Sequence, residues 1–427
     1  MMEQESWNKA YLAKFSQNER LYYLIGYLIW PFGLTLEAFR QWEKPWSKNA
    51  FWLFCIFFGF TFVIAEEGGA DSDRYARDFI DYAHSGMKLK DLWGLFYVVG
   101  SDQTDIVVPL VMFFLSRITD NPAALFVIFA LISGYFYSRN TWYVLERVNG
   151  KLRGFILLLF ITFLLINPIW NINGFRFHLA SQIFLFGTLP YLLEGKKKYL
   201  IWSGVSVLAH FTFLLPVAIL GMFVLLKNRT SIYLIFFIVT AFFREIEMEW
   251  FQSNLAFLPK VIFAEISNYM SEGYAEFRAD IDEELPWFIT YSAMGMRWTI
   301  YVIIFSTMYF GRDLLKERSE LKTLLSFSLL FYGFVNIASL IPSGDRFATV
   351  ANTFVIPYFM IFLVTLPRIG ESLLIRIISF PLLMLFCAVQ LRIGMVFFGI
   401  MTLIGNPFTA AFYSDPVPLI TQLKNLF

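Results

Sequence analysis

Long apolar runs recur along this chain from one end to the other, and they reach the length of about 15 to 25 residues that spans lipid as a helix. Hydrophobic residues make up 58% of the 427 residues, whereas charged residues make up only 16%. Because lipid offers the backbone no hydrogen-bond partner, such runs must be helical. The sequence therefore predicts an all-α polytopic integral membrane protein with about 11–13 hydrophobic helices, some of them short or re-entrant.

The composition argues against several other classes of protein. A net charge of +1 provides no electrostatic basis for binding nucleic acid. The two cysteines, Cys55 and Cys387, lie inside apolar runs, so the sequence indicates neither a disulfide framework nor a zinc site. The N-terminus lacks the basic and then apolar pattern of a removable signal peptide. Since no internal repeat is visible, we expect a single transmembrane domain over residues 1–427.

The charged loops predict an orientation in the membrane. Segment 66–105 carries nine acidic and four basic residues, and segment 244–286 carries ten and three. Loops rich in Lys and Arg stay on the cytoplasmic side, so we expect these two acidic segments to be outer loops. The basic connecting segments that predict the cytoplasmic side are 40–48, 139–153, 196–198 and 312–322.

Three apolar regions are too short or too irregular for simple spans. Segment 106–115 is short enough to be re-entrant, and 393–404 is expected to be a partial span. If 199–226 were one span, the basic residues Lys227 and Arg229 would lie outside. Two short helices broken near 210–216 remove this conflict. We therefore expect His210 at a turn near the outer mouth of the protein.

Ionisable side chains in or beside apolar runs are rare, because burying them in lipid is costly, and they usually face a cavity or a partner. On the outer side they recur at helix ends in four places: Asp71, Asp73 and Arg74; Arg176 and His178; His210; and Asp345 and Arg346.

These residue types suggest one kind of chemistry. A guanidinium grips phosphate through two parallel hydrogen bonds, so Arg176 and Arg346 entering one outer cavity would bind a diphosphate. Histidine is well suited to removing a proton from a hydroxyl near neutral pH. We therefore expect His210 to be the general base, with His178 and the carboxylates of Asp345 and Asp73 as reserve candidates.

Structural interpretations of the same residues stay open. Arg176 could pair with a carboxylate, His210 could be a hydrogen-bonded core residue, and Asp345 could cap a helix. His178 lies two positions after Arg176, so on a regular helix it would point away from that residue. Asp71 and Asp73 in the sequence DSD form the single candidate metal site.

The order of the short motifs resembles a known family. DSDRYARDF at 71–79, NGFRFHLA at 173–180, LAHFTFLLP at 208–216 and GDRF at 344–347 are similar to the EpsG branch of Wzy-type polysaccharide polymerases. The resemblance covers residues 50–365 approximately. It implies functional roles for Asp73, Tyr75, Arg176, His210 and Arg346. With Arg74, these residues form the expected substrate site around the catalytic candidates.

The resemblance implies a membrane-embedded glycosyltransferase similar to the C-type enzymes. Such a protein joins oligosaccharide repeat units carried on undecaprenyl diphosphate, using a lipid-linked donor and acceptor, at the periplasmic face of the bacterial inner membrane. It needs no cofactor or metal. Whether a chain-length regulator also binds stays open. The alternatives are a ligase of O-antigen type, or a flippase or transporter, although the latter predicts paired halves that the sequence lacks.

Overall fold

The computed structural model describes residues 19, 21–64, 71–94, 96, 105–150, 152–244, 260–365, 373–413 and 417–425. Across this part of the chain the secondary structure is helical, with isolated β-bridges and no strand. Six stretches are long and apolar enough to cross a membrane, which confirms the predicted all-α polytopic fold. They are Pro122–Arg147 (α7), Phe155–Glu194 (α8, Phe155–Ile166, and α9, Phe175–Glu194), Trp287–Phe310 (α16), Ser319–Ala338 (α18), Arg346–Thr365 (α19) and Ile375–Gly394 within α20 (Leu373–Gly394).

Shorter helices complete the membrane bundle. One group packs against α7 and α9 and another against α18. Short 3-10 turns connect several of them. The helices are α2 (Pro31–Arg40), α3 (Ser47–Phe60), α10 (Leu200–Ala209), α11 (Leu214–Leu226) and α12 (Thr230–Thr240), and the turns are η1 (Ile169–Gly174), η2 (Lys197–Tyr199) and η3 (Phe211–Phe213).

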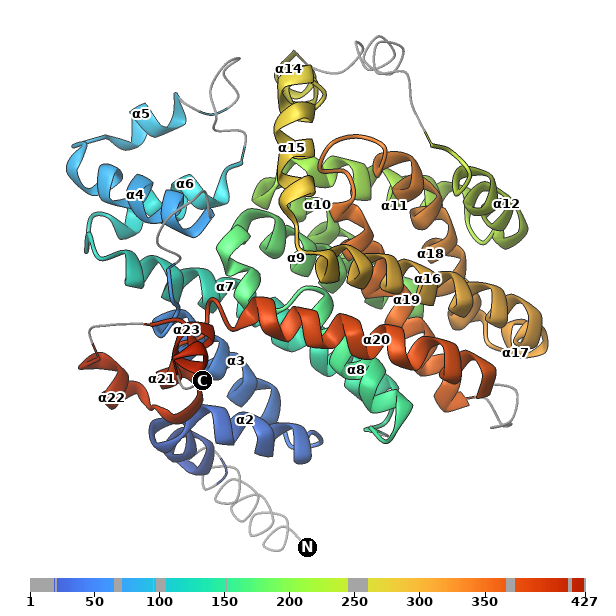
Figure 1. Cartoon of the computed structure of the whole chain (residues 1–427), viewed down its shortest axis with the longest axis horizontal. Helices are drawn as coiled ribbons and strands as arrows, with labels where there is room; N and C mark the ends of the chain where they lie inside the picture. Colours follow the sequence, from blue (N-terminus) through green and yellow to red (C-terminus); the bar gives the residue numbers. More distant parts are fainter. Residues whose placement is uncertain are drawn as a thin grey trace, which may run out of the picture.

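Further helices lie around the bundle. Figure 1 shows α4, α5 and α6 at its upper left, α14 and α15 above it, and α21, α22 and α23 beside α2 and α3 at its lower left. Their bounds are Asp71–His84 (α4), Leu89–Trp93 (α5), Val107–Leu115 (α6), Lys260–Tyr269 (α14), Glu272–Glu284 (α15), Arg312–Glu317 (α17), Ile400–Ile404 (α21), Pro407–Ala411 (α22) and Leu419–Lys424 (α23).

Helix α4 illustrates how the helices around the bundle attach to it. Asp71 and Asp73 lie in its first turn, where negative charge is favourable to the helix dipole. Tyr75 and Phe79, one turn apart, are buried and face the bundle, while Tyr82 is half-buried. The helical spacing of Tyr75, Phe79 and Tyr82 in the sequence predicts an amphipathic helix, and α4 has this form.

The basic segments gather at one end of the bundle, which we call the basic end. Arg147 pairs with Glu194 at the end of α9, and Lys196 pairs with the same carboxylate. Arg139 of α7 donates a hydrogen bond to the backbone carbonyl of Lys48 at 3.2 Å. These contacts bring segments 40–48, 139–153 and 196–198 together.

The fourth basic segment, 312–322, lies at the same end because α9 and α19 run in the same direction. The Arg346 guanidinium at the start of α19 lies 5.7 Å from the ring of Phe177 at the start of α9. Further along both helices, the rings of Phe184 and Phe354 are 5.9 Å apart. Since α18 precedes α19 and runs against it, its start lies at the basic end. We call the opposite end, where α9 and α19 begin, the site end.

The predicted break in the segment 199–226 is present. Helix α10 ends at His210, whose φ of −155° and ψ of 120° are extended, and α11 begins after the turn η3. Pro216 falls in the first turn of α11, where a missing N–H breaks no helical hydrogen bond. Helix α11 then returns to the basic end, where Asn228 donates to Thr323 Oγ1 at 2.8 Å.

Two other expectations differ from the structure or fall partly outside it. Segment 393–404 is no continuous partial span, because α20 ends at Gly394 and α21 starts only at Ile400. The isolated bridge between Phe62 and Phe398 lies between them. The spacing of Trp7, Tyr11 and Phe15 also predicts a helix over residues 1–20 on the membrane surface. This segment lies outside the described residues, apart from Glu19.

Candidate functional site

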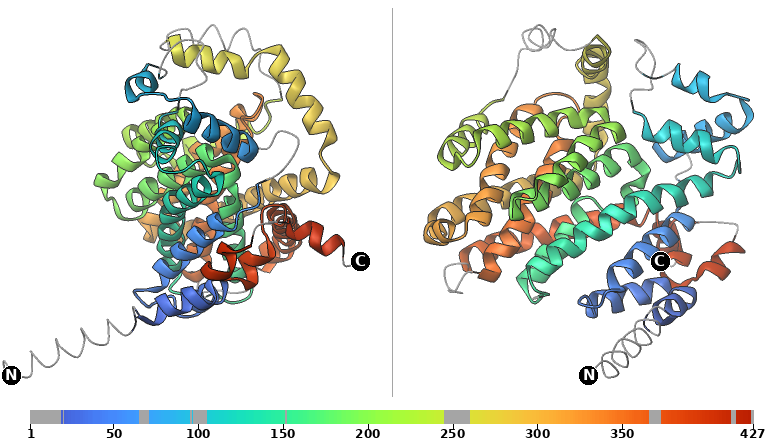
Figure 2. Two further views of the ribbon diagram at one scale, coloured as in Figure 1. Left: turned by 90° about the vertical axis from the view of Figure 1, so that its left-hand side faces the viewer. Right: turned by 180° about the vertical axis from the view of Figure 1, so that it is seen from behind.

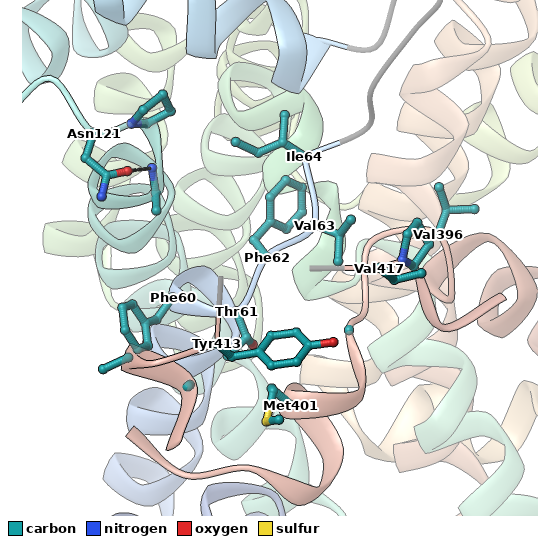
Figure 3. A pocket seen from close by; sticks show the side chains of 16 residues that line it. Phe60, Thr61, Phe62, Val63, Ile64, Asn121, Val396, Met401, Tyr413 and Val417 are labelled. Carbon is teal, nitrogen blue, oxygen red and sulfur yellow. Dashed lines mark hydrogen bonds between the residues drawn. The ribbon is translucent and has the colours of Figure 1, made fainter. Parts of the chain in front are cut away.

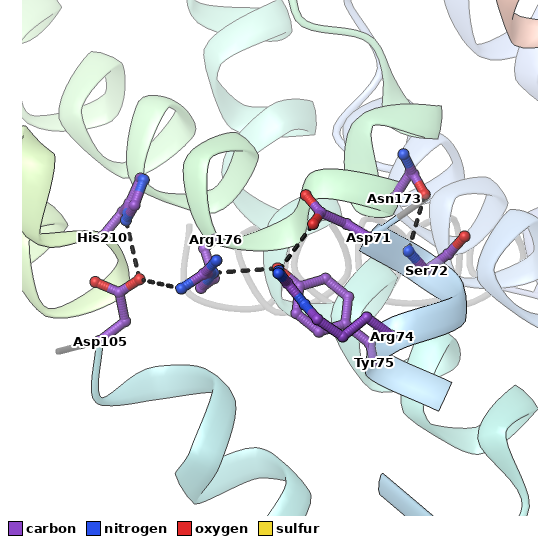
Figure 4. A network of polar contacts seen from close by, with 8 residues as sticks. All are labelled: Asp71, Ser72, Arg74, Tyr75, Asp105, Asn173, Arg176 and His210. Carbon is purple, nitrogen blue, oxygen red and sulfur yellow. Dashed lines mark hydrogen bonds and ion pairs between the residues drawn. The ribbon is translucent and has the colours of Figure 1, made fainter. Parts of the chain in front are cut away.

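A buried carboxylate organises the polar groups at the site end. Asp105, two residues before the start of α6, has a side chain only 2% exposed. Its Oδ2 accepts hydrogen bonds from His210 Nδ1 at 2.9 Å and from the Arg176 guanidinium at 3.1 Å. Its Oδ1 accepts the backbone N–H of Phe211 at 2.7 Å. One carboxylate thus joins the loop before α6, the start of α9 and the end of α10 (Figure 4).

The break between α10 and α11 explains why the Asp105 carboxylate lies beside His210. A broken helix exposes backbone groups that must find partners in a place without water. The Phe211 N–H, just beyond the end of α10, finds Asp105, and the backbone N–H of Ile106 donates to the Leu208 carbonyl at 3.1 Å. The break therefore creates the docking point for the chain that enters α6.

The surroundings of Asp105 keep its carboxyl ionised. Burial by itself would raise the pKa of Asp105, but His210, then Arg176 and the Phe211 N–H, together hold this pKa below its usual value. The carboxylate accepts the Nδ1–H of His210, which directs the ring's other nitrogen, Nε2, to act as acceptor. An imidazole fixed in this tautomer is suited to accept a proton at Nε2.

Arg176 continues the network toward α4. Its Nε donates to the hydroxyl of Tyr75 at 3.3 Å, and its guanidinium also binds Asp105. Burial raises the pKa of the Tyr75 phenol although Arg176 acts in the opposite direction, so the hydroxyl stays neutral. Asn173 Oδ1 accepts the backbone N–H of Ser72 at 3.0 Å, which fixes the start of α4 against η1.

The charged residues on the outer face of α4 pair with one another. Arg74 binds Asp71 at 2.8 Å, and Arg77 binds Asp73 at 2.6 Å. Both arginines are exposed, so Asp73 and Arg74 lie at the rim of the network rather than inside it. Within the described part of the chain no three His, Cys, Asp or Glu side chains gather as metal ligands would. Each aspartate of the DSD sequence thus has an arginine as its partner.

Arg346 approaches His210 from the α19 side. Its Nε donates to the Ser343 carbonyl at 2.8 Å, and its guanidinium lies over Phe177. The Phe177 ring is also 6.0 Å from the His210 ring. Arg176 and Arg346 therefore both belong to the neighbourhood of His210, but only Arg176 contacts Asp105.

Two cavities adjoin Arg346. One of about 220 Å³ is mostly apolar and lies between η3, the 341–347 turn and α14, with Ile266 of α14 and the following Met270 in its lining. Another, of about 370 Å³, lies between α16, α18, α19 and α20 and has both polar and apolar walls. Asp345 is exposed and lines this second cavity, where it makes no contact with the Asp105 network.

The structure does not bring His178 to the network. Its Nδ1 bonds Asn167 Oδ1 at 2.8 Å, while Nε2 is buried and finds no hydrogen-bond partner among the residues that the structure describes. Gln182 lies one turn further along α9 and donates to the Asn167 carbonyl at 3.3 Å. The two-residue spacing from Arg176 turns His178 into the α7–α8–α9 core, as the helical geometry predicted. His178 is therefore a packing residue here, and we do not retain it as a catalytic candidate.

A cavity of about 770 Å³ lies farther along the molecule, between the end of α3 and the C-terminal segment (Figure 3). Its lining includes Phe62, Asn121, Met401, Tyr413 and Val417. Because none of its lining residues is charged, it offers no acid, base or phosphate ligand comparable to the site end.

Two residues at the site end lie outside the sequence motifs. Asp105 could have been noticed because it directly precedes the apolar run 106–115. Arg297 lines the 370 Å³ cavity, and the signal was its place inside the apolar stretch of α16. In each case the partner residues lie far away in sequence, so their roles were not visible there.

The comparison with known families identifies the family of the chain. A profile of the EpsG family matches residues 50–399, most of the chain. The chain belongs to the EpsG family. The members are Wzy-type polysaccharide polymerase-like proteins, so this EpsG-family chain is a multi-pass membrane protein of that kind. No curated protein and no solved structure matches the chain significantly.

Proposed function

We propose that this EpsG-family protein is a polysaccharide polymerase that joins oligosaccharide repeat units carried on undecaprenyl diphosphate, at the site end of its bundle. The observation that supports this most strongly is the hydrogen bond between Asp105 and His210, buried at the helix break and flanked by two arginines. It provides a base in a fixed tautomer beside groups that bind phosphate.

In the proposed reaction His210 Nε2 accepts the proton of an acceptor hydroxyl as its oxygen attacks the anomeric carbon of the donor. The bond from that carbon to the diphosphate oxygen breaks, and undecaprenyl diphosphate leaves with the bonding electrons. Arginine stabilises the negative charge on the leaving group. The proton on His210 then passes to solvent. Asp105 holds the ring and stabilises its protonated form without reacting itself.

The orientation follows from the charges. Basic segments meet at the end opposite to Asp105 and His210, and such segments stay in the cytoplasm. We therefore place the site on the periplasmic face of a bacterial inner membrane. Labelling of single introduced cysteines with an impermeant reagent tests this, because the native Cys55 and Cys387 are buried. We expect His84→Cys to react from outside the cell and Lys316→Cys to react only from inside.

The enzyme test uses the purified full chain in lipid nanodiscs with synthetic lipid-linked repeat units. His210→Gln keeps hydrogen-bonding capacity but loses the base, so we expect polymer formation to fall about 10²- to 10⁴-fold. His84→Gln is the matched control, because His84 is exposed near Asp120 and takes no part in the network. Polymer formation by His210→Gln at near the wild-type rate would remove the base role.

The same assay separates the competing functions. A polymerase extends one lipid-linked glycan with another and yields a ladder of products. A ligase transfers a glycan to a different acceptor and leaves the repeat units unjoined. A flippase moves intact lipid-linked units across a vesicle membrane without changing them.

A further inference from the structure

The 370 Å³ cavity beside Arg346 is lined by polar and charged side chains as well as apolar ones. It lies between α16, α18, α19 and α20, of which α16 and α20 run side by side in Figure 1. Its walls carry the guanidiniums of Arg297 and Arg346 and the amides of Asn352 and Gln390. Lipid cannot hydrogen-bond such groups, so a cavity that carries them is suited to water or a polar ligand.

Arg297 is the least explained of these groups. It interrupts the apolar stretch of α16, one of the membrane-crossing helices. Within the described residues its polar contact is a 3.3 Å hydrogen bond to Ser339 Oγ, and no carboxylate pairs with it. A guanidinium has five N–H donors and stays charged, and Arg297 is exposed, so its other donors are accessible to a ligand. An arginine at such a place normally serves a ligand pathway.

Arg176, by contrast, is already engaged. Its guanidinium binds the Asp105 carboxylate, and its Nε binds the Tyr75 hydroxyl. An anion bound there would have to compete with a carboxylate that is itself buried. The two arginines expected from sequence to hold a diphosphate are therefore not equivalent, because only Arg346 reaches the polar cavity.

We propose that Arg297 and Arg346 together hold the diphosphate of the polyprenyl-diphosphate donor in this cavity. This assignment rests on the proposed function and names the residues that bind its donor. Arg297 thus replaces Arg176 as the partner of Arg346, and Arg176 is a positioning residue that acts through Asp105.

The geometry fits the reaction. The donor's diphosphate is bonded to the carbon that reacts, so it must lie close to the base. Arg346 meets this condition, since it shares Phe177 with His210. The acceptor's diphosphate lies a whole repeat unit away from the hydroxyl that reacts, so it does not have to lie close to His210.

The other walls fit the rest of the head group and the lipid. Asp345 also lines the cavity, and because a carboxylate repels phosphate it is suited to sugar hydroxyls instead. On the membrane side, Met294 lines the cavity and is 49% exposed. Such an apolar rim lets a polyprenyl chain leave sideways into the bilayer.

The test is equilibrium binding of undecaprenyl diphosphate, without sugar, to the full chain in nanodiscs. We expect Arg297→Ala to weaken binding about tenfold or more. Arg297→Lys should restore only part of the affinity, because an ammonium cannot make the two parallel hydrogen bonds of a guanidinium. Arg392→Ala is the matched control and should change Kd less than about twofold. Arg392 does not line the cavity, so its loss removes no charge-assisted hydrogen bond to the diphosphate. Arg392 lies at the site end of α20 and stacks on Phe288 at 4.4 Å.

Undecaprenyl monophosphate serves as a second probe. The paired arginines predict that Arg297→Ala weakens diphosphate binding more than monophosphate binding. Unchanged diphosphate affinity in a folded Arg297→Ala variant, checked by its thermal unfolding, overturns the assignment. Weakening by Arg176→Ala in place of Arg297→Ala would also overturn it.

The outcomes separate the two proposals. If the wild type forms polymer and Arg297→Ala binds undecaprenyl diphosphate normally, the donor-site assignment fails and the proposed function stands. If binding depends on Arg297 while the wild type forms no polymer, the diphosphate site stands and the proposed function fails.

Discussion

Oδ2 of Asp105 lies 2.9 Å from Nδ1 of His210, although 105 positions separate the two residues in sequence. Each is almost fully buried, and the contact joins the loop before α6 to the break between α10 and α11. A buried carboxylate that orients an imidazole through Nδ1 is a common way to prepare Nε2 for proton transfer.

The first prediction concerns the carboxylate itself. Asp105→Asn keeps the shape but removes the charge that fixes the ring and stabilises its protonated form. We expect polymer formation to fall by about 10²- to 10⁴-fold, comparable to loss of the base. The measurement is the initial rate of polymer formation in nanodiscs as a function of pH. Asp81→Asn is the control, because Asp81 is exposed on α4. A wild-type pH profile in Asp105→Asn would show that the carboxylate only holds the fold.

The second prediction is a pH dependence of stability. The folded-state pKa of Asp105 is lowered from 3.8 by its partners in spite of burial. Its contribution is therefore present above the unfolded-state pKa, and it is lost as the pH falls through the folded-state value. Thermal unfolding midpoints measured from pH 7 downward should decline more steeply in the wild type than in Asp105→Asn.

Asp78 on α4 should change stability with pH in the direction opposite to Asp105. Burial raises the folded-state pKa of Asp78. Its ionisation therefore opposes folding as the pH rises through that value, and Asp78→Asn should relieve this loss near neutral pH. Equal pH slopes in the wild type, Asp105→Asn and Asp78→Asn would contradict both assignments.

The third prediction separates the two arginines kinetically. Arg346→Lys should raise the KM for the lipid-linked donor, because a forked contact to the diphosphate is lost. Arg176→Lys should chiefly lower kcat with little change in KM, because Arg176 acts through Asp105 and Tyr75. Steady-state rates at varied donor concentration give both constants. A pure KM effect in Arg176→Lys would return that residue to the diphosphate site.

The fourth prediction concerns the turn that carries Arg346. A Cβ at Gly344 would overlap the backbone carbonyl of Ala338 at the end of α18. Gly344→Ala should therefore shift the turn and cost about 1–3 kcal/mol of stability. Gly221 in α11 has open space around it, so Gly221→Ala should be neutral or stabilising by up to about 1 kcal/mol. Thermal unfolding of both variants tests the contrast, and equal stability would contradict the close packing at Gly344.

Local physics explains what could be predicted from the sequence. Apolar length and the cost of unpaired backbone in lipid determined the helical membrane class. Lys227 and Arg229 belong on the cytoplasmic side with the other basic segments, and this requirement predicted the helix break at His210. The cost of charge in an apolar run was enough to single out Arg176 and Arg346. Each of these inferences needs only neighbouring residues, because the energy involved is set by the local solvent.

Tertiary structure decided which of these groups meet. Asp105 becomes the partner of His210 only because the loop before α6 docks on the broken helix. His178 carries the same chemistry as His210, but the turn of α9 directs it to Asn167 in the core. Arg297 became a candidate only when α16 closed a cavity with α18, α19 and α20. Contacts of this kind depend on how distant segments pack and on where side chains point, and no local pattern of residues encodes either.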